Sequence, residues 1–171
     1  MKTFNTLKFA ILGSGYIGQA IVKGFIATGK ISVNQIIITR RNVQLLKSLA
    51  QRRFVTQTDN CDAVRKTDVI IIAVQPKQLN NLLSEIRCEL SPNKHIIISV
   101  VSGVSSSKII KHIGKKILVV RAVPTTTIAL LESMTCIASK NAPNDTLQTT
   151  KALFDLVGET TIIDEEQMIS C

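Results

Sequence analysis

The chain has 171 residues, of which 45% are hydrophobic and 19% are charged. This composition supplies a core for one domain and excludes a disordered or fibrous protein. The net charge of +9 favours an anionic partner, whereas a chain with no Trp and one Tyr is poorly suited to stacking on single-stranded nucleic acid. A solvated basic face without a ligand is the alternative interpretation of the charge.

Short apolar runs, rich in Ile and Val and without polar alternation, recur along the chain. Such runs are typical of strands that are buried on both faces of a parallel sheet. The clearest runs span residues 9–12, 36–38, 69–74, 96–101 and 117–120, and weaker patterns at 54–55, 134–138 and 160–163 predict further strands.

Segments with the spacing of amphipathic helices separate these runs. The expected helices begin near Ile17, at a cap on Asn42, near Leu79, at a cap on Ser105 and near Asp145. This alternation predicts an α/β fold of the Rossmann type, in which a doubly wound, mostly parallel sheet lies between two helical layers (three-layer αβα).

The expected domain spans residues 1–163. A capping-box pattern at Asp164 and Gln167 then predicts the opening of a further helix over 164–171. A helix of that length is too short to be stable alone, so we expect it to be the start of another structural unit.

Residues 13–18 read Gly-Ser-Gly-Tyr-Ile-Gly, which is the G-x-G-x-x-G pattern, and they follow an expected strand and open an expected helix. In such a unit Gly13 forms the tight turn, Gly15 lets the backbone approach a pyrophosphate, and Gly18 lets the helix pack closely on the strand. The pattern therefore predicts a dinucleotide site at the helix N-terminus, with a glycine-rich turn without ligand as the alternative.

The end of the second expected strand indicates which dinucleotide is bound. NAD sites usually carry Asp or Glu there, but no acidic residue precedes Asp59 in this chain. Arg40 and Arg41 stand at this position, and guanidinium groups suit a 2′-phosphate. We predict a preference for NADP(H) over NAD(H), the alternative being that both arginines are ordinary surface residues.

Four segments carry a resemblance to a known family. They read FAILGSGYIGQAIVKGF, DVIIIAVQPKQ, IIISVVSGVS and VVRAVPTTT, with a basic turn after the first. In this order they resemble the N-terminal half of the pyrroline-5-carboxylate reductases over residues 7–171. The resemblance implies an oxidoreductase of proline biosynthesis that reduces a cyclic imine, 1-pyrroline-5-carboxylate, to L-proline with NAD(P)H.

The resemblance also implies which residues lie at the cofactor, from its pyrophosphate through its adenosine end to its nicotinamide. They are Gly13, Ser14, Gly15, Tyr16, Ile17 and Gly18 at the pyrophosphate, Arg40 and Arg41 at the 2′-phosphate, Asn60 at the adenosine, Ala73, Val74, Gln75, Pro76 and Lys77 beside the cofactor, and Val100 and Ser102 by the nicotinamide. Thr125 is the candidate catalytic residue, as a group that orients the nicotinamide or the substrate.

The chain departs from the family pattern in the glycine loop, at Gln75, where the family has Lys, and at Thr125, where it has Asn. Two alternatives therefore stay open. One is another NADP-dependent oxidoreductase of the 6-phosphogluconate-dehydrogenase-like superfamily, such as a hydroxyacid dehydrogenase or a deazaflavin-dependent reductase. The other is a non-catalytic nucleotide-binding remnant.

In the family a helical domain follows, forms the dimer and supplies most of the substrate site. Residues 164–171 match only the approach to that domain, so we expect a homo-oligomer only where the domain is present.

Four scattered cysteines lack metal-ligand spacing, which predicts free thiols in a reducing cytoplasm and no metal site. His95 is expected at a strand edge and His112 on a helix surface, rather than in catalysis. No apolar stretch is long enough for a membrane helix, and neither a membrane nor a nucleic acid is an expected partner.

Overall fold

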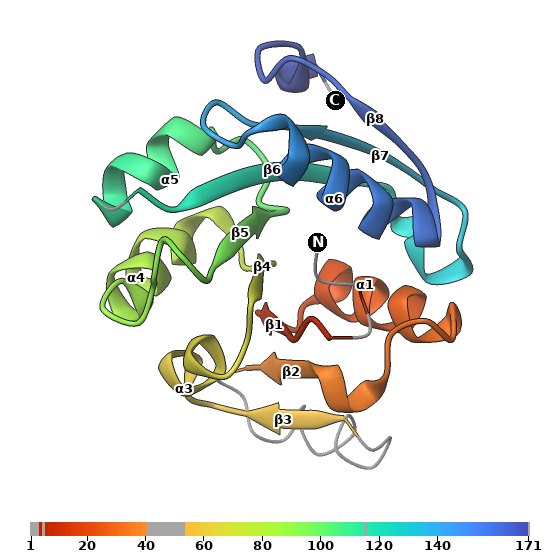
Figure 1. The fold of residues 1–171 in the computed structure, drawn as a ribbon, viewed down its shortest axis with the longest axis horizontal. Coiled ribbons are helices and arrows are strands. Elements are labelled where there is room, and N and C mark those ends of the chain that lie inside the picture. The colour runs from red at the N-terminus through yellow and green to blue at the C-terminus, as the bar shows by residue number, and fades with distance from the viewer. Residues whose placement is uncertain (1–3, 5, 41–53, 115, 171) are drawn as a thin grey trace.

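The computed structural model describes residues 4, 6–40, 54–114 and 116–170. Within them the strands form one sheet in the order β3-β2-β1-β4-β5-β6-β7-β8 (Figure 1). The strands are β1 (Phe9–Leu12), β2 (Ile36–Thr39), β3 (Val55–Gln57), β4 (Val69–Ile72), β5 (Ile96–Ser99), β6 (Leu118–Pro124), β7 (Ser133–Ala138) and β8 (Gly158–Ile162).

Among the described strands, neighbours from β3 to β6 are all parallel, as are β7 and β8, and the β6–β7 pair alone is antiparallel. The order 3-2-1-4-5-6 is that of a doubly wound dinucleotide-binding sheet, in which the chain builds outward from β1 in both directions. The predicted α/β class and mostly parallel sheet are confirmed.

Helices cover both faces of the sheet. They are α1 (Tyr16–Ala27), α3 (Asn60–Arg65), α4 (Pro76–Ile86), α5 (Ser106–Ile113) and α6 (Asn144–Phe154), with 3-10 turns η1 (Val33–Gln35), η2 (Thr126–Leu130), η3 (Asp155–Val157) and η4 (Gln167–Ser170). Figure 1 shows α3, α4 and α5 on one side and α1 and α6 on the other. The helix expected from Asn42 lies outside the described residues.

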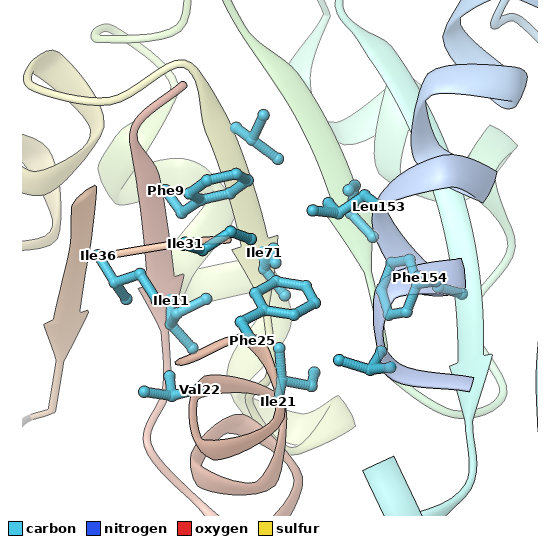
Figure 2. Close-up of a cluster of buried hydrophobic side chains, with 14 of the residues drawn as sticks. Phe9, Ile11, Ile21, Val22, Phe25, Ile31, Ile36, Ile71, Leu153 and Phe154 are labelled. Carbon is cyan, nitrogen blue, oxygen red and sulfur yellow. The ribbon is translucent and has the colours of Figure 1, made fainter. Parts of the chain in front are cut away.

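Two apolar cores result, one under each helical layer. Along β1, Phe9 and Ile11 point into the core beneath α1 and α6, whereas the alternate residues join the core beneath α3, α4 and α5. In the first core the ring of Phe25 lies 6.0 Å from those of Phe9 and Phe154, measured between centroids (Figure 2). Each fully buried Ile or Phe contributes about 1.5–3 kcal/mol, so this alternation fixes the register of the strands.

His95 lies just before β5, at the edge of that strand as expected, with its side chain buried and its Nδ1 accepting a hydrogen bond from the Ser91 N–H at 2.9 Å. The helix expected from Asp164 begins only at Gln167, as the 3-10 turn η4, although the Gln167 side chain does accept a hydrogen bond from the Asp164 N–H at 3.3 Å. No described helix is both long enough and apolar enough to cross a bilayer.

Candidate functional site

A cavity of about 390 Å³ opens where the carboxyl ends of β1, β2 and β4 meet. β1 and β4 are neighbours in the sheet, but the chain continues from β1 to β2 on one side and from β4 to β5 on the other. Open α/β sheets bind ligands at the carboxyl ends of the strands at such a point. Its described lining residues are Gly13, Ser14, Gly15, Thr39, Arg40, Asn60, Ala73, Val74, Gln75, Lys77, Gln78 and Leu82. Most of the predicted residues therefore come together in one place.

The glycine loop shapes the floor of the cavity. Gly13 has φ +98°, and a Cβ there would lie 2.8 Å from the Ala73 carbonyl oxygen. A Cβ on Gly18 would lie 2.3 Å from the Gly13 carbonyl oxygen, so α1 packs directly against the loop. By contrast, nothing lies within 4 Å of a Cβ built on Gly15. Two glycines allow close packing, and the third leaves open space above the backbone.

The N-terminus of α1 faces this space without a side-chain cap. Gly15 is its N-cap, no side chain caps the helix, and its first turn carries no acidic residue. The free N–H groups and the positive end of the helix dipole favour an anion at this point.

Positive side chains flank the same opening. Arg40, which follows β2, donates a hydrogen bond from NH1 to the Ser14 carbonyl oxygen at 2.6 Å, and the Gln19 amide donates to the same oxygen at 2.9 Å. Lys77, near the start of α4, lines the cavity as well. No acidic residue stands among the described lining residues, so the cavity is suited to a ligand with several negative charges.

A chain of hydrogen bonds forms one wall. The Thr39 carbonyl accepts from the Gly13 N–H at 3.3 Å, and the Thr39 hydroxyl donates to Asn60 Oδ1 at 2.6 Å. The Asn60 amide in turn donates to both oxygens of Glu85, at 3.0 and 3.2 Å. Asn60 opens α3, whose N-cap is Asp59, so the helix start fixes this side chain beside the glycine loop.

Some predicted residues do not line the cavity. Tyr16 and Pro76 adjoin lining residues in the sequence, and Ile17 and Gly18 lie in the first turn of α1. Val100, Ser102 and Thr125 come from the loops after β5 and β6. Arg41 lies outside the described residues.

The hydroxyl of Thr125 is engaged within its own hairpin. It bonds Thr127 Oγ1 at 2.7 Å and accepts from the Met134 N–H at 3.1 Å. Its role in orienting a ligand stays a prediction.

A buried polar cluster fixes the start of α5, just after the loop that holds Val100 and Ser102. The Glu165 carboxylate accepts from the Ser106 N–H and from the Ser106 hydroxyl, both at 2.5 Å, and pairs with the Arg121 guanidinium at 3.5 Å. All three residues are at most 6% exposed. Glu165 thus acts as a distant cap on the helix and ties the segment after β8 to the loop.

The other features add no competing site. A second cavity, of about 290 Å³ near the beginnings of β4 and β5, holds none of the predicted residues. In the described parts of the chain no three His, Cys, Asp or Glu side chains gather as metal ligands.

Sequence reasoning missed three lining residues: Thr39, Gln78 and Leu82. Thr39 could have been found, because it precedes Arg40 at the end of β2. Gln78 and Leu82 lie on α4, and their direction depends on how that helix packs.

A profile of the family described as NADP oxidoreductase, coenzyme F420-dependent, matches residues 8–103. Two pyrroline-5-carboxylate reductases of Dictyostelium discoideum are each 38% identical to the chain. The matches cover 94% of this chain and 31% of the first relative, and 97% of this chain and 60% of the second. The chain therefore spans only part of these relatives.

Solved structures show the same fold. A pyrroline-5-carboxylate reductase from Coxiella burnetii is 28% identical and superposes with a TM-score of 0.88 over 96% of this chain and 62% of its own. A Plasmodium falciparum pyrroline carboxylate reductase, solved with NADP bound, is 20% identical with a TM-score of 0.85 over 96% of this chain and 60% of its own. The chain thus belongs to the NADP oxidoreductase, coenzyme F420-dependent family, in which it corresponds to the N-terminal part of the pyrroline-5-carboxylate reductases.

Proposed function

We propose that this chain is the cofactor-binding domain of a reductase that converts 1-pyrroline-5-carboxylate to L-proline with NADPH. One observation carries the proposal: the cavity joins an uncapped helix N-terminus, open space above Gly15 and two cations, without an acidic lining residue among those described. This arrangement fits a dinucleotide diphosphate. The likeness to pyrroline-5-carboxylate reductases supports the choice of substrate over the hydroxyacid and deazaflavin alternatives.

The nicotinamide, when bound, supplies a hydride to the carbon of the C=N bond. The ring nitrogen of the imine, once protonated, then becomes the secondary amine of proline, and no proton has to be taken from the substrate. The domain therefore needs to bind and orient rather than to supply a strong base. Its own contribution is the fixed glycine loop, the α1 amides and the cations around the cavity.

We infer a preference for NADP over NAD from the position of Arg40. Its guanidinium lies at the end of β2, held on the Ser14 carbonyl oxygen, where an NAD site usually carries a carboxylate. The remaining guanidinium donors suit a 2′-phosphate. Arg41 is proposed to act with it.

The experiment is a comparison of NADPH and NADH binding by fluorescence titration. Replacing Arg40 by Glu and Arg41 by Ala is expected to weaken NADPH binding at least about tenfold, and NADH binding far less. Arg65→Ala is the matched control, because Arg65 on α3 lies away from the cavity and its guanidinium pairs with Glu89, which follows α4. Equal losses for both dinucleotides would refute the preference, and a wild-type chain that binds neither would refute the cofactor role.

Other parts of the proposal concern the complete protein. We propose that residues 164–171 lead into a helical domain that completes the imine site and forms a homo-oligomer. Turnover of pyrroline-5-carboxylate, followed by NADPH absorbance with and without such a domain supplied, tests this. We also propose that the protein works in a reducing cytoplasm, which suits cysteines that form no disulfide among the described residues.

A further inference from the structure

The wall of the cavity formed by Thr39 and Asn60 depends on a residue that is not among the described lining residues. Glu85 lies on α4, one turn after the lining residue Leu82, and its side chain is exposed. Its two carboxylate oxygens accept hydrogen bonds from the Asn60 side-chain nitrogen at 3.0 and 3.2 Å. The Asn60 side-chain oxygen in turn accepts a hydrogen bond from the Thr39 hydroxyl at 2.6 Å. The three side chains form one continuous hydrogen-bonded chain beside the glycine loop.

The chemistry of the partners shows which of them sets the direction of this chain. A threonine hydroxyl can donate or accept, so Thr39 tolerates either orientation of the Asn60 amide. An ionised carboxylate can only accept, so Glu85 requires the amide nitrogen to face it. With the nitrogen turned to Glu85, the Asn60 oxygen faces Thr39, and the Thr39 hydroxyl must donate its hydrogen.

We propose that Glu85 is a positioning residue for the cofactor pocket: it fixes the orientation of the Asn60 amide and thereby the donors and acceptors along this wall. Its consequence for NADPH binding rests on the proposed function, whereas the orientation itself does not. Without Glu85 the Asn60 amide can rotate by about 180°, which exchanges its oxygen and its nitrogen. The wall then presents two arrangements of hydrogen-bond donors and acceptors to the adenosine end of the cofactor.

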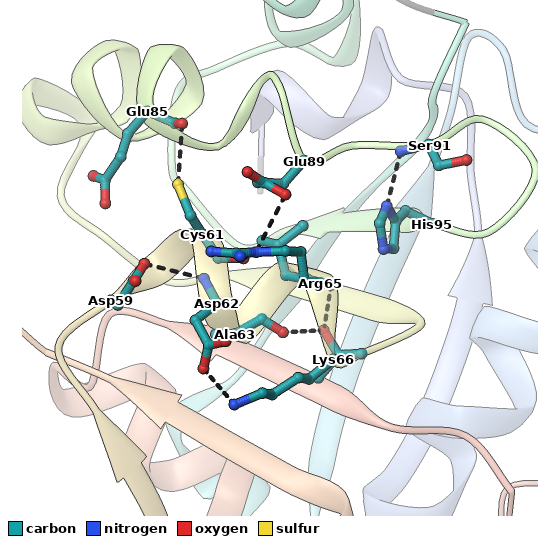
Figure 3. A network of polar contacts seen from close by, with 12 residues as sticks. Asp59, Cys61, Asp62, Ala63, Arg65, Lys66, Glu85, Glu89, Ser91 and His95 are labelled. Atoms are coloured by element: carbon teal, nitrogen blue, oxygen red, sulfur yellow. Dashed lines mark hydrogen bonds and ion pairs between the residues drawn. The ribbon is translucent and has the colours of Figure 1, made fainter.

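The local packing allows this effect to be separated from a structural one. α3 and α4 are also joined by Cys61 Sγ, which contacts the main-chain carbonyl of Glu85 at 3.3 Å (Figure 3). A change of the Glu85 side chain leaves that carbonyl in place. Arg65 and Glu89, at 3.3 Å, pair the same two parts of the chain away from Asn60, so Glu89→Ala is a matched control for the loss of one carboxylate.

The first measurement needs no cofactor. The side-chain amide of Asn60 is followed by ¹⁵N–¹H NMR of the whole chain, and its two signals are identified by their loss in Asn60→Ala. We expect Glu85→Ala to shift or broaden them, Glu85→Gln to retain signals close to wild type because the Gln oxygen still accepts, and Glu89→Ala to leave them unchanged. Unchanged Asn60 signals in Glu85→Ala would overturn the proposal.

The second measurement is the NADPH dissociation constant of the same variants. Glu85→Ala is expected to weaken binding about fivefold, and Glu85→Gln less than about twofold. In an Asn60→Ala background the Glu85→Ala change should have no further effect, because it acts only through that amide. An equal loss in both backgrounds would contradict the positioning role. If the wild type binds no NADPH, the proposed function fails while the NMR arm still decides the orientation.

Discussion

The two halves of the sheet differ in how their charged side chains are partnered. Around β1, β2 and β4, α1 begins without a side-chain cap, the space above Gly15 is open, and the described contact of the Arg40 guanidinium is with the Ser14 main-chain oxygen. Around β6, β7 and β8, the buried Arg121 guanidinium is instead paired with the Glu165 carboxylate. Open groups are available to a ligand, whereas satisfied groups hold the fold, so the two halves divide binding from stability.

The largest expected effect lies in the second half. Glu165→Ala would leave the buried Arg121 guanidinium without its carboxylate and the Ser106 N–H and hydroxyl without an acceptor. We expect a loss of about 3 kcal/mol in the free energy of unfolding, measured by urea denaturation.

The neighbouring glutamate provides the control. Glu166 has an exposed side chain and pairs with Lys140 at 2.9 Å, so Glu166→Ala should leave the unfolding midpoint nearly unchanged. If Glu165→Ala weakened NADPH binding strongly without lowering stability, the division between the two halves would not hold.

A smaller effect is expected inside the glycine loop, where two similar substitutions should differ. Gly18→Ala places a methyl group 2.3 Å from the Gly13 carbonyl oxygen and should cost about 1–3 kcal/mol of stability. Gly15→Ala meets no protein atom within 4 Å, so it should keep its stability but weaken NADPH binding about tenfold. Thermal unfolding and NADPH titration of both variants are the test. Full NADPH affinity in Gly15→Ala would mean that no ligand group approaches there.

The smallest expected effect is on the pH dependence of stability, and it comes from His95, which does not line the cavity. Burial, helped by the Lys94 charge, lowers the pKa of His95 despite the opposing influence of the Val64 and Thr67 main chain and of the Asp68 charge. Because the folded state favours neutral imidazole, this contribution to stability is full above the ordinary pKa of about 6.5 and is lost as the pH falls toward the folded value. Protonation of Nδ1 would also break its bond from the Ser91 N–H (Figure 3).

Urea unfolding at a series of pH values below neutrality measures this loss. His95→Asn should flatten the profile. An unchanged profile in His95→Asn would show that other groups cause the acid sensitivity.

The sequence allowed the fold to be predicted where local signals agreed with burial. The run at Phe9–Leu12 is a strand with the predicted bounds, and Ser105 caps α5 by accepting from the Lys108 N–H at 3.2 Å. The predicted runs at 69–74 and 96–101 are each two residues longer than the strands β4 and β5, whose pairing ends at Ile72 and Ser99. The reason is that the apolar sequence continues into the loop after the last paired residue.

The site was predictable in part for the same reason. Glycine spacing and residues at strand ends are local, so the sequence pointed to Gly13, Arg40 and Lys77, which the structure brings to the cavity. The place of Glu85 beside Asn60 has no such local pattern, because it depends on α4 bringing residue 85 against residue 60. The hairpin that engages Thr125 is likewise a product of β6–β7 pairing, which no local pattern specifies.

The contact between Arg40 and the Ser14 carbonyl has a thermodynamic consequence. A free arginine side chain loses up to about 2 kcal/mol of rotamer entropy when it is immobilised. Here one guanidinium N–H already holds the side chain at the rim of the cavity, at 2.6 Å from that oxygen, while its other donors can turn to an arriving anion. Much of the ordering has therefore taken place before binding, so the entropic penalty for recruiting this cation is small.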